Sequence, residues 1–346
     1  MIVEILKDIF ENSSFDESLD RLYVVLEDQH RLLIKDDDFI DSLMQSSWFA
    51  GLRGTKKEII YRQIEWSLQS SMSIIPKITI SNERKGVFTI EESIRYLRQP
   101  FILILENSYN DSIFIDSLIK NFPKQCKTLK KNREDGWFLY GMGGGSAIPL
   151  LLKTKMRSFN GEIFSKERHK YLRCFVLIDS DKRYPEEDLK PETKSLIQFL
   201  DDHEVPYHVL EKREMENYLP DEAFSEIFDN REYIDSYLRL NPIQKDYFDL
   251  EKGFESKRFE QLDDDIQELY RDIPVSDKTV LRQNSLESFN QKNNNFKSDF
   301  PQLFLSHKIT KENLMKRCSH HLISTQKHPF DPNELPNLLN QISSLL

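Results

Sequence analysis

Two short hydrophobic runs in the middle of the chain end abruptly at acidic residues. Phe175-Val-Leu-Ile178 is followed by Asp179-Ser-Asp181, and Phe101-Ile-Leu-Ile-Leu105 is followed by Glu106. Four or five consecutive apolar residues, several of them β-branched, are typical of strands buried on both faces of a parallel sheet. The pattern therefore predicts two buried strands, each with carboxylates at its carboxyl end.

Helical patterns and a third strand surround these two runs. Ile113–Ile119 has the apolar spacing of a helix, and Asp111, just before Ser112, is placed to cap that helix or to line a site. Tyr207-His-Val-Leu210 predicts a further short strand, and Glu216 follows it. Alternating strands and helices predict an α/β fold with a mainly parallel sheet and helices on both faces.

The acidic residues at the strand ends are candidate metal ligands. Open α/β sheets bind ligands outside the carboxyl ends of their strands. Asp179 and Asp181 repel each other there unless a cation lies between them, and Mg²⁺ is the hard cation that prefers oxygen ligands. The alternative is that these aspartates only form turns or cap helices, which is common at strand ends.

The order Glu106, Asp179-x-Asp181, Glu216 resembles the Toprim domain, the metal-binding module of topoisomerases, primases and nucleases of the OLD family. Glu216-Asn-Tyr-Leu is most similar to the OLD-type and stand-alone Toprim nucleases. The resemblance covers about residues 98–222 and implies a Rossmann-like Toprim fold. The first motif of the family reads Glu-Gly-x-x-Asp, whereas this chain has Asn107 and Asn110, with Asp111 as the nearest acid.

The resemblance implies an Mg²⁺- or Mn²⁺-dependent endonuclease that hydrolyses phosphodiester bonds in DNA or RNA. It implies that Asp179 and Asp181 hold the metal and that Glu106 is a general acid or base, or a ligand. It also implies that Glu216 holds a second metal or positions the water, and that Asp111 is a ligand only if it does more than cap. The cations expected to contact the scissile phosphate are Lys182, Arg183 and Lys212.

The family also implies partners. OLD nucleases carry a fused ATPase, but this chain has no Gly-x-x-x-x-Gly-Lys-Ser/Thr loop, so a separate ATPase subunit is expected, in a bacterial anti-phage system. A first alternative is a catalytically degenerate Toprim subunit that binds or regulates, suggested by the altered first motif. A second is a phosphatase of the haloacid-dehalogenase kind, with Asp179 as nucleophile and Asp181 as acid. It ranks third because a strand with its own acid precedes Asp179.

Three regions are expected. Residues 1–95 read as mainly helical, with Ile5, Ile9 and Phe10 at helical spacing and short strands near Ile78–Ile80 and Val87–Ile90. Residues 96–222 form the catalytic Toprim domain, and 223–346 form a helical C-terminal region. We expect the two terminal regions, which show no chemical motif, to dock a protein partner, with homodimerisation as the alternative.

Two smaller motifs leave alternatives open. Gly143-Gly-Gly145 lies between an apolar run and a helical pattern and predicts either a phosphate cradle or a tight turn. Cys318 with His320-His321 suggests a metal site, but adjacent histidines do not share a helix face, which disfavours it. Polar residues make 283–295 a linker candidate.

Composition limits the class of protein. The net charge is −10, an unfavourable balance for binding nucleic acid, although basic residues cluster in 124–133 and 153–173. The chain has three scattered cysteines, no signal-peptide pattern and no apolar run of about 18 residues. We therefore expect a cytoplasmic protein with no disulfides and no membrane association.

Overall fold

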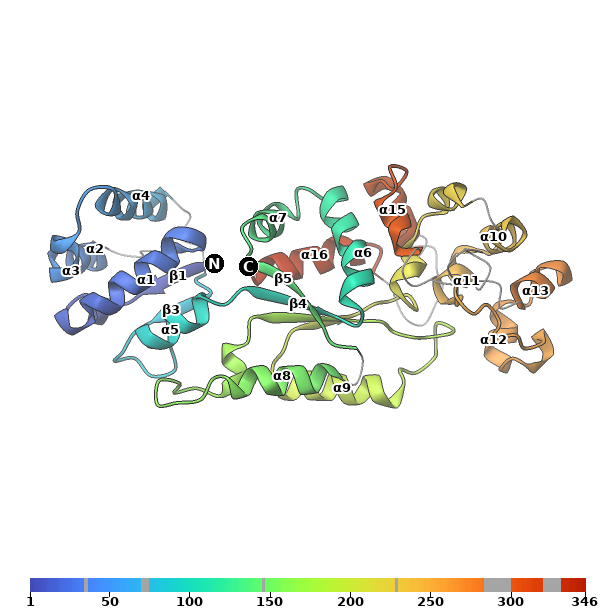
Figure 1. Ribbon diagram of the computed structural model, residues 1–346, viewed down its shortest axis with the longest axis horizontal. Coiled ribbons are helices and arrows are strands. Elements are labelled where there is room, and N and C mark those ends of the chain that lie inside the picture. The colour runs from blue at the N-terminus through green and yellow to red at the C-terminus, as the bar shows by residue number, and fades with distance from the viewer. Residues whose placement is uncertain (34–36, 70–74, 145–146, 228–229, 283–299, 320–330) are drawn as a thin grey trace.

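The computed structural model describes residues 1–33, 37–69, 75–144, 147–227, 230–282, 300–319 and 331–346. Within them lie two parallel sheets, a three-stranded sheet of order β2-β1-β3 and a four-stranded sheet of order β5-β4-β6-β7, with helices packed around both (Figure 1). The expected α/β class with mainly parallel sheets is confirmed.

The four-stranded sheet contains the predicted buried strands. They are β4 (Phe101–Leu105) and β6 (Cys174–Ile178), flanked by β5 (Phe138–Met142) and β7 (Tyr207–Val209). Ile104 of β4 lies opposite Gly141 on one side and Val176 on the other. Every residue of β6 is buried, which explains its uninterrupted apolar sequence.

Helices cover both faces of this sheet (Figure 1). Leu103 and Leu105 pack with α6 (Ser108–Asn121) and α7 (Lys127–Glu134), whereas Ile104 packs with α8 (Ile148–Arg157) and α9 (Pro191–Asp202). Successive side chains of a strand point to opposite faces, so β4 contributes to two hydrophobic cores at once.

The strand order creates a crevice at the carboxyl edge of this sheet. The chain runs from β4 to β5 on one side, then crosses back to β6 on the other side of β4. At such a reversal the connections leave the sheet in opposite directions, and a crevice opens between the two strand ends. Glu106 follows β4 and Asp179 follows β6, so both acids lie at this reversal.

The C-terminal region is helical, as predicted. Many of its apolar side chains, up to Leu346, belong to the same hydrophobic core as β4 and α6. The boundary expected at residue 222 therefore does not separate two hydrophobic cores.

Residues 283–295, His320 and His321 lie outside the described part of the chain. The helices are α10 (Arg231–Leu238), α11 (Pro242–Tyr247), α12 (Asp264–Leu269), α13 (Val275–Arg282), α15 (Lys311–Ser319) and α16 (Glu334–Ser344).

The N-terminal region, expected to be mainly helical, is built on a three-stranded sheet, and of its strands the sequence predicted only Ile78–Ile80. The strand expected at Val87–Ile90 is wrong, because Phe88 forms a single bridge with Ile80 and a helix begins at Ile90. Residues that we expected to begin a helix at Ile5 instead form β1 (Ile2–Ile5), which lies between β2 (Arg31–Leu33) and β3 (Ile78–Ile80). Ile5 and Ile9 are both buried in one core, which explains how a strand and a short turn imitate helical spacing. The helices are α1 (Asp16–Gln29), α2 (Asp37–Gln45), α3 (Ser47–Gly51), α4 (Thr55–Gln69) and α5 (Ile90–Leu97).

A buried carboxylate joins the two sheet units. Glu92 of α5 is fully buried and accepts hydrogen bonds from Tyr171 Oη at 2.5 Å and from Ser165 N at 2.6 Å. Burial alone would raise its pKa, but these bonds and the backbone N–H of Thr89 hold the pKa at about 2. The N-terminal unit is thereby fixed to the loop that leads into β6. No helix in the described ranges is long and apolar enough to span a membrane.

The turn after β5 supplies a paired stability test. A Cβ on Gly143 would lie 2.7 Å from Ile148 Cγ1 and 3.0 Å from Ile104 Cγ2, both fully buried, whereas one on Gly144 would meet only Glu106 O at 3.7 Å. We expect Gly143→Ala to lower the free energy of unfolding by about 1–3 kcal/mol through overpacking. Gly144→Ala, the matched control, should change it much less. Equal effects in urea denaturation would contradict this packing.

Candidate functional site

A cavity of about 320 Å³ lies at the carboxyl ends of β4 and β6. Its walls carry eight carboxylates and three cations, an excess of negative charge that a bound cation would relieve. All five predicted metal-site residues line it: Glu106, Asp111, Asp179, Asp181 and Glu216. The other charged residues of the wall are Glu214, Asp249, Glu251, Lys190, Arg213 and Lys252.

Glu106 and Asp179 are the most perturbed acids of the cavity. Burial, with Asp181, Asp111 and Glu214 close by, raises the pKa of Glu106 to about 7. Burial likewise raises the pKa of Asp179 well above its ordinary value, and the nearby charge of Glu106 adds to this. Asp179 Oδ1 is buried and has no hydrogen-bond partner among the described residues. A buried oxygen without a partner is costly, so this atom is suited to a ligand.

Asp181 is held at the rim by an unusual backbone conformation. Its φ of 55° is left-handed, a region that Asp tolerates better than most residues. Its N–H donates to Arg213 O at 2.9 Å, and its Oδ2 accepts from Lys190 Nζ at 2.8 Å. The carboxylate is therefore already paired with one cation of the chain.

Asn217 brings the C-terminal region to the site. It is buried, and its Oδ1 accepts from Glu214 N at 3.0 Å. Its Nδ2 donates to Lys245 O at 2.8 Å and to Phe248 O at 2.9 Å. These bonds tie the acidic segment after β7 to α11 and to Phe248, the residue that follows it. As a result, Asp249 and Glu251 reach a cavity that the sequence assigned only to residues before 222.

Asp111 does not cap a helix at Ser112, as one interpretation of the sequence had it. The helix α6 begins at Ser108, and its N-cap is Asn107, whose side chain accepts from Asn110 N. Asp111 lies in the first turn, where its Oδ2 accepts from Asn107 N at 2.7 Å. Its carboxylate thus satisfies a backbone N–H at the helix start and lines the cavity as well.

The cations predicted to contact a scissile phosphate do not line this cavity. Lys212 is fully buried; its Nζ donates to Asp246 and, at 2.9 Å, to Arg317 O, so that prediction is wrong. Lys182 is absent from the wall, and its Nζ lies 3.4 Å from Pro185 O. Arg183 pairs with Glu187 and Asp263 instead. Lys212 is unavailable to a phosphate because a lysine ammonium inside the protein needs a carboxylate partner.

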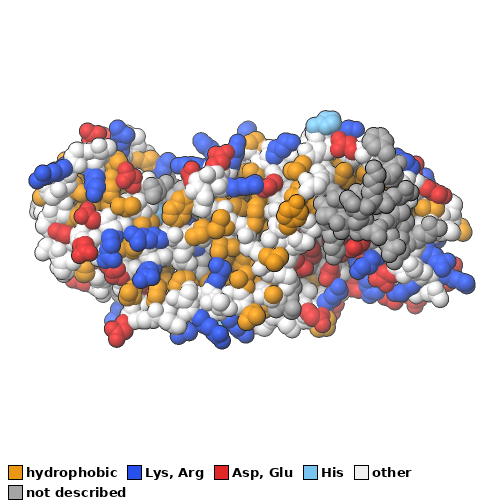
Figure 2. Space-filling model, viewed as in Figure 1, with side chains coloured by type: hydrophobic (Ala, Val, Ile, Leu, Met, Phe, Trp, Pro, Cys, Tyr) orange, Lys and Arg blue, Asp and Glu red, His pale blue; other side chains and the backbone are white. Residues whose placement is uncertain are grey.

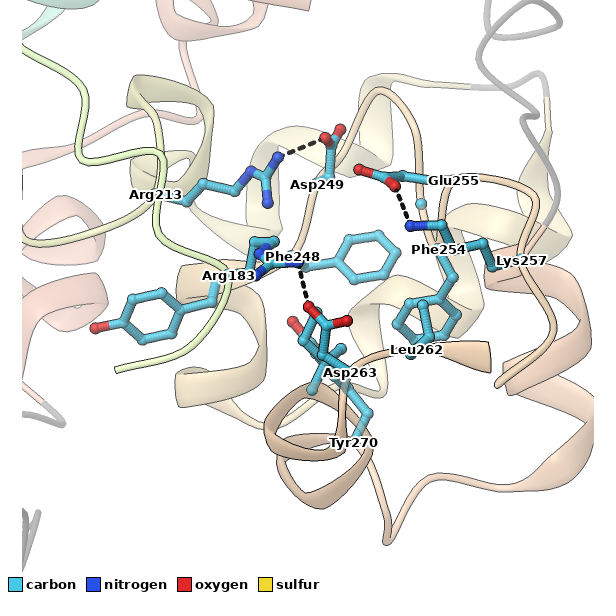
Figure 3. Close-up of a pocket in the computed structure, with 13 residues that line it drawn as sticks. Arg183, Arg213, Phe248, Asp249, Phe254, Glu255, Lys257, Leu262, Asp263 and Tyr270 are labelled. Carbon is cyan, nitrogen blue, oxygen red and sulfur yellow. Dashed lines mark hydrogen bonds and ion pairs between the residues drawn. The ribbon is translucent and has the colours of Figure 1, made fainter. Parts of the chain in front are cut away.

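Arg183 belongs to a smaller neighbouring cavity of about 40 Å³, whose walls combine charged side chains with aromatic ones such as Phe248, Phe254 and Tyr270 (Figure 3). In Figure 3, Arg183 reaches Asp263 and Arg213 reaches Asp249, at 2.5 Å and 2.7 Å. Arg213 and Asp249 line both cavities. This ion pair is therefore part of the wall of both cavities.

Sequence reasoning missed part of the wall. Glu214 had a local signal, because it stands two residues before Glu216 in the same segment after β7. Lys190, Asp249, Glu251 and Lys252 had none. The basic residues of 124–133 and 153–173, which flank the site in sequence, do not line the cavity.

Gly143 and Gly144, the described glycines of the predicted phosphate cradle or tight turn, form a hydrogen-bonded turn. Gly143 N donates to Leu105 O at 2.9 Å, and Ala147 N donates to Gly144 O at 2.7 Å. The N–H of Gly143 is thus not available to a phosphate. The tight-turn interpretation is favoured for Gly143 and Gly144, while Gly145 lies outside the described residues.

The donor atoms of the wall suit a hard divalent ion in their chemistry but not in their spacing. The wall offers carboxylate oxygens, which Mg²⁺ and Mn²⁺ prefer, and one of them, Asp179 Oδ1, is buried without a partner. Within the described ranges, no three Asp, Glu, His or Cys side chains stand close enough together to hold a metal. Asp181 is instead paired with Lys190.

Comparison with known proteins adds no relative. No protein-family model, no curated protein and no solved structure matches the chain. The function is therefore argued from the site itself.

The raised pKa of Glu106 predicts a pH dependence of stability in EDTA. The folded protein favours the protonated form, so this contribution is present below the ordinary value of 4.5 and is lost as pH rises through about 7. Relative to Glu106→Gln, the wild type should lose free energy of unfolding across that window. Glu134→Gln, at an exposed acid of α7, is the control. Urea denaturation at several pH values checks this; parallel wild-type and Glu106→Gln curves would refute it.

Proposed function

We propose that the chain is a Toprim-type nuclease that hydrolyses phosphodiester bonds with Mg²⁺ or Mn²⁺. The observation that carries the proposal is the acidic cavity at the strand-order reversal, with Asp179 Oδ1 buried and without a partner among the described residues. Acids at the ends of β4 and β6 and after β7 stand in the order that resembles the Toprim motifs. The same strand order supports a Rossmann-like fold of this kind.

The proposed roles follow from position and charge. Asp179 and Asp181 would hold the ion, and Glu216 would hold a second ion or orient water. A bound divalent ion supplies charge neutralisation at the phosphate and lowers the pKa of a bound water. Glu106, with a pKa of about 7, can accept or donate a proton at neutral pH. Lys190 and Lys252, at the exposed rim, replace Lys182 and Lys212 as the proposed phosphate contacts.

The net charge of the chain favours a protein that works with a partner. The net charge is −10, and Lys and Arg side chains are interspersed with Asp and Glu across the face in Figure 2 rather than joined in one basic patch. Binding of duplex DNA draws on such a patch. We therefore propose weak nucleic-acid binding by the isolated chain, and activation through a separate ATPase subunit, since the sequence has no P-loop. An anti-phage role rests on the family resemblance alone.

A catalytically inactive Toprim subunit is the second candidate. Two observations favour it. Lys190 forms an ion pair with Asp181, and no three of the described acids lie close enough together to hold a metal. The two candidates differ in metal binding. An intact site gains thermal stability with Mg²⁺ or Mn²⁺, whereas an inactive one leaves the Tm unchanged.

The central test is Asp179→Asn. We expect metal-dependent cleavage of plasmid, single-stranded DNA or tRNA to fall at least about 100-fold, because several kcal/mol of transition-state stabilisation is lost. In EDTA the variant should be as stable as the wild type or more so, since repulsion among the acids is relieved. Asp188→Asn changes an exposed acid beyond the cavity and should leave cleavage intact. Unaltered cleavage by Asp179→Asn would reject the assignment.

Asp111 has its own test. If its carboxylate mainly accepts the Asn107 N–H, Asp111→Asn keeps an oxygen acceptor there and should retain most metal-dependent cleavage. Asp111→Ala removes the acceptor and should lower the free energy of unfolding by about 0.5–2 kcal/mol. A loss of cleavage in Asp111→Asn as deep as that in Asp179→Asn would show instead that Asp111 is a metal ligand.

A further inference from the structure

Strand β5 leaves one edge of the four-stranded sheet open. In the order β5-β4-β6-β7 it is a terminal strand, paired with β4 alone among the described strands. Gly143, which follows β5, donates its N–H to Leu105 O of β4 at 2.9 Å. Because alternate residues of a strand direct their backbone groups to opposite sides, the N–H and C=O of Phe138, Tyr140 and Met142 point away from β4. No hydrogen bond from another described element reaches these groups.

This edge also lacks the features that protect free strand edges in other proteins, such as charged side chains and proline. The opposite edge strand, β7, follows Pro206 and contains His208, which pairs with Glu334. In the N-terminal sheet, the edge strand β2 contains Arg31. The sequence of β5, Phe-Leu-Tyr-Gly-Met, has neither a charge nor a proline. An edge of this kind is a template on which another strand can pair.

Hydrophobic side chains are exposed along the same strand. Leu139 is 45% exposed and Met142 is 69% exposed. Figure 2 shows hydrophobic side chains gathered on the middle of one face, over the position of β4 and β5 in Figure 1. A strand added to β5 would remove apolar surface from water and satisfy the outward backbone groups in the same step.

The register of β5 makes it complementary to itself. If two copies pair antiparallel about a two-fold axis at Tyr140, Tyr140 faces Tyr140 of the second copy and Phe138 faces Met142. Facing residues of this kind exchange both N–H···O bonds, so all the outward groups are paired. Leu139 then faces Gly141, which has no side chain and leaves room for the exposed leucine. Self-pairing sets like charges opposite each other in a charged strand, and β5 has none.

We propose that this chain forms a homodimer through antiparallel pairing of two β5 strands, which joins the two four-stranded sheets into one. A second copy is the occupant that fits, because a two-fold contact requires one surface to match itself. The carboxyl ends of the two β4 strands then point in opposite directions, so the two acidic cavities lie at opposite edges of the joined sheet. The proposal is independent of the nuclease activity, since no residue of β5 lines the acidic cavity.

The test is analytical ultracentrifugation of the full-length protein from about 1 to 100 μM, a range that covers weak association. We expect a monomer–dimer equilibrium. The dimer fraction should increase with salt, because salt screens the repulsion between two chains that each have a net charge of −10. A monomer throughout the range would overturn the proposal. So would a series of larger species, because the two-fold pair is closed.

Variants locate the interface. Met142→Pro removes an outward N–H and keeps the bonds to β4, and edge strands tolerate proline where the N–H faces solvent. The dissociation constant of the dimer should rise at least about tenfold. Met142→Ala, the matched control, keeps the N–H and should weaken the dimer less. An effect of Met142→Ala equal to that of Met142→Pro would reject backbone pairing.

A charge at the edge provides a second test that does not depend on proline. Leu139→Lys places two ammonium groups beside the two-fold axis and should raise the dissociation constant at least about tenfold. The position is exposed, so the variant should fold with an unchanged Tm. Val275→Lys changes a residue of α13 that is 78% exposed, and as the control it should leave the dimer intact. A dimer that survives both Leu139→Lys and Met142→Pro would use another surface and reject the proposal.

Discussion

The structure depends on holding eight carboxylates around one cavity against their mutual repulsion. Burial, with the neighbouring acids adding to it, raises the pKa values of Glu106 and Asp179. The carboxylates stay together because neutral and cationic groups of the C-terminal region fix the backbone that carries them. Asn217 joins two acidic segments, and the buried Lys212 ammonium pairs with Asp246 behind them. The C-terminal helices are therefore part of the site and not an appendage to the sheet.

The buried cations and the exposed cations of the cavity therefore have different roles: the buried ones stabilise the acidic segment, and the exposed ones can bind other anions. Arg317 donates to Asp246 at 3.0 Å and to Asn217 O at 2.6 Å, so it shares the support of the acidic segment with Lys212. Removing one member of such a buried pair leaves an uncompensated charge, which is strongly destabilising. Lys190, by contrast, is exposed and can exchange Asp181 for another anion at little cost. Among the described cations of the cavity wall, the exposed ones are therefore better placed than the buried ones to contact an anionic ligand.

The same strand order occurs in both sheets, with the first strand in the chain at the centre. In each sheet this path of the backbone opens a crevice at the carboxyl ends, and residues that follow the strands line it. Around the larger sheet these residues are mostly acids, which favour a divalent ion. Around the smaller sheet four acids and two cations line the cavity beside a few apolar residues. The Glu92 contact with Ser165 and Tyr171 joins the two units, so both crevices belong to one connected framework.

The sequence by itself determined the strands β4 and β6, the acids at their ends and the α/β class. These follow from local rules, because a strand buried on both faces needs an unbroken apolar run and parallel strands end at one edge of a sheet. Tertiary structure alone decided that Asp249 and Glu251 reach the cavity, that Lys212 is buried, and that Ile5 belongs to a strand. Each of these depends on partners distant in sequence: Asp246 lies 34 residues from Lys212, and β1 pairs with strands beginning at Arg31 and Ile78. Local periodicity contains no information about such partners, because burial and pairing are set by the packing of the whole chain.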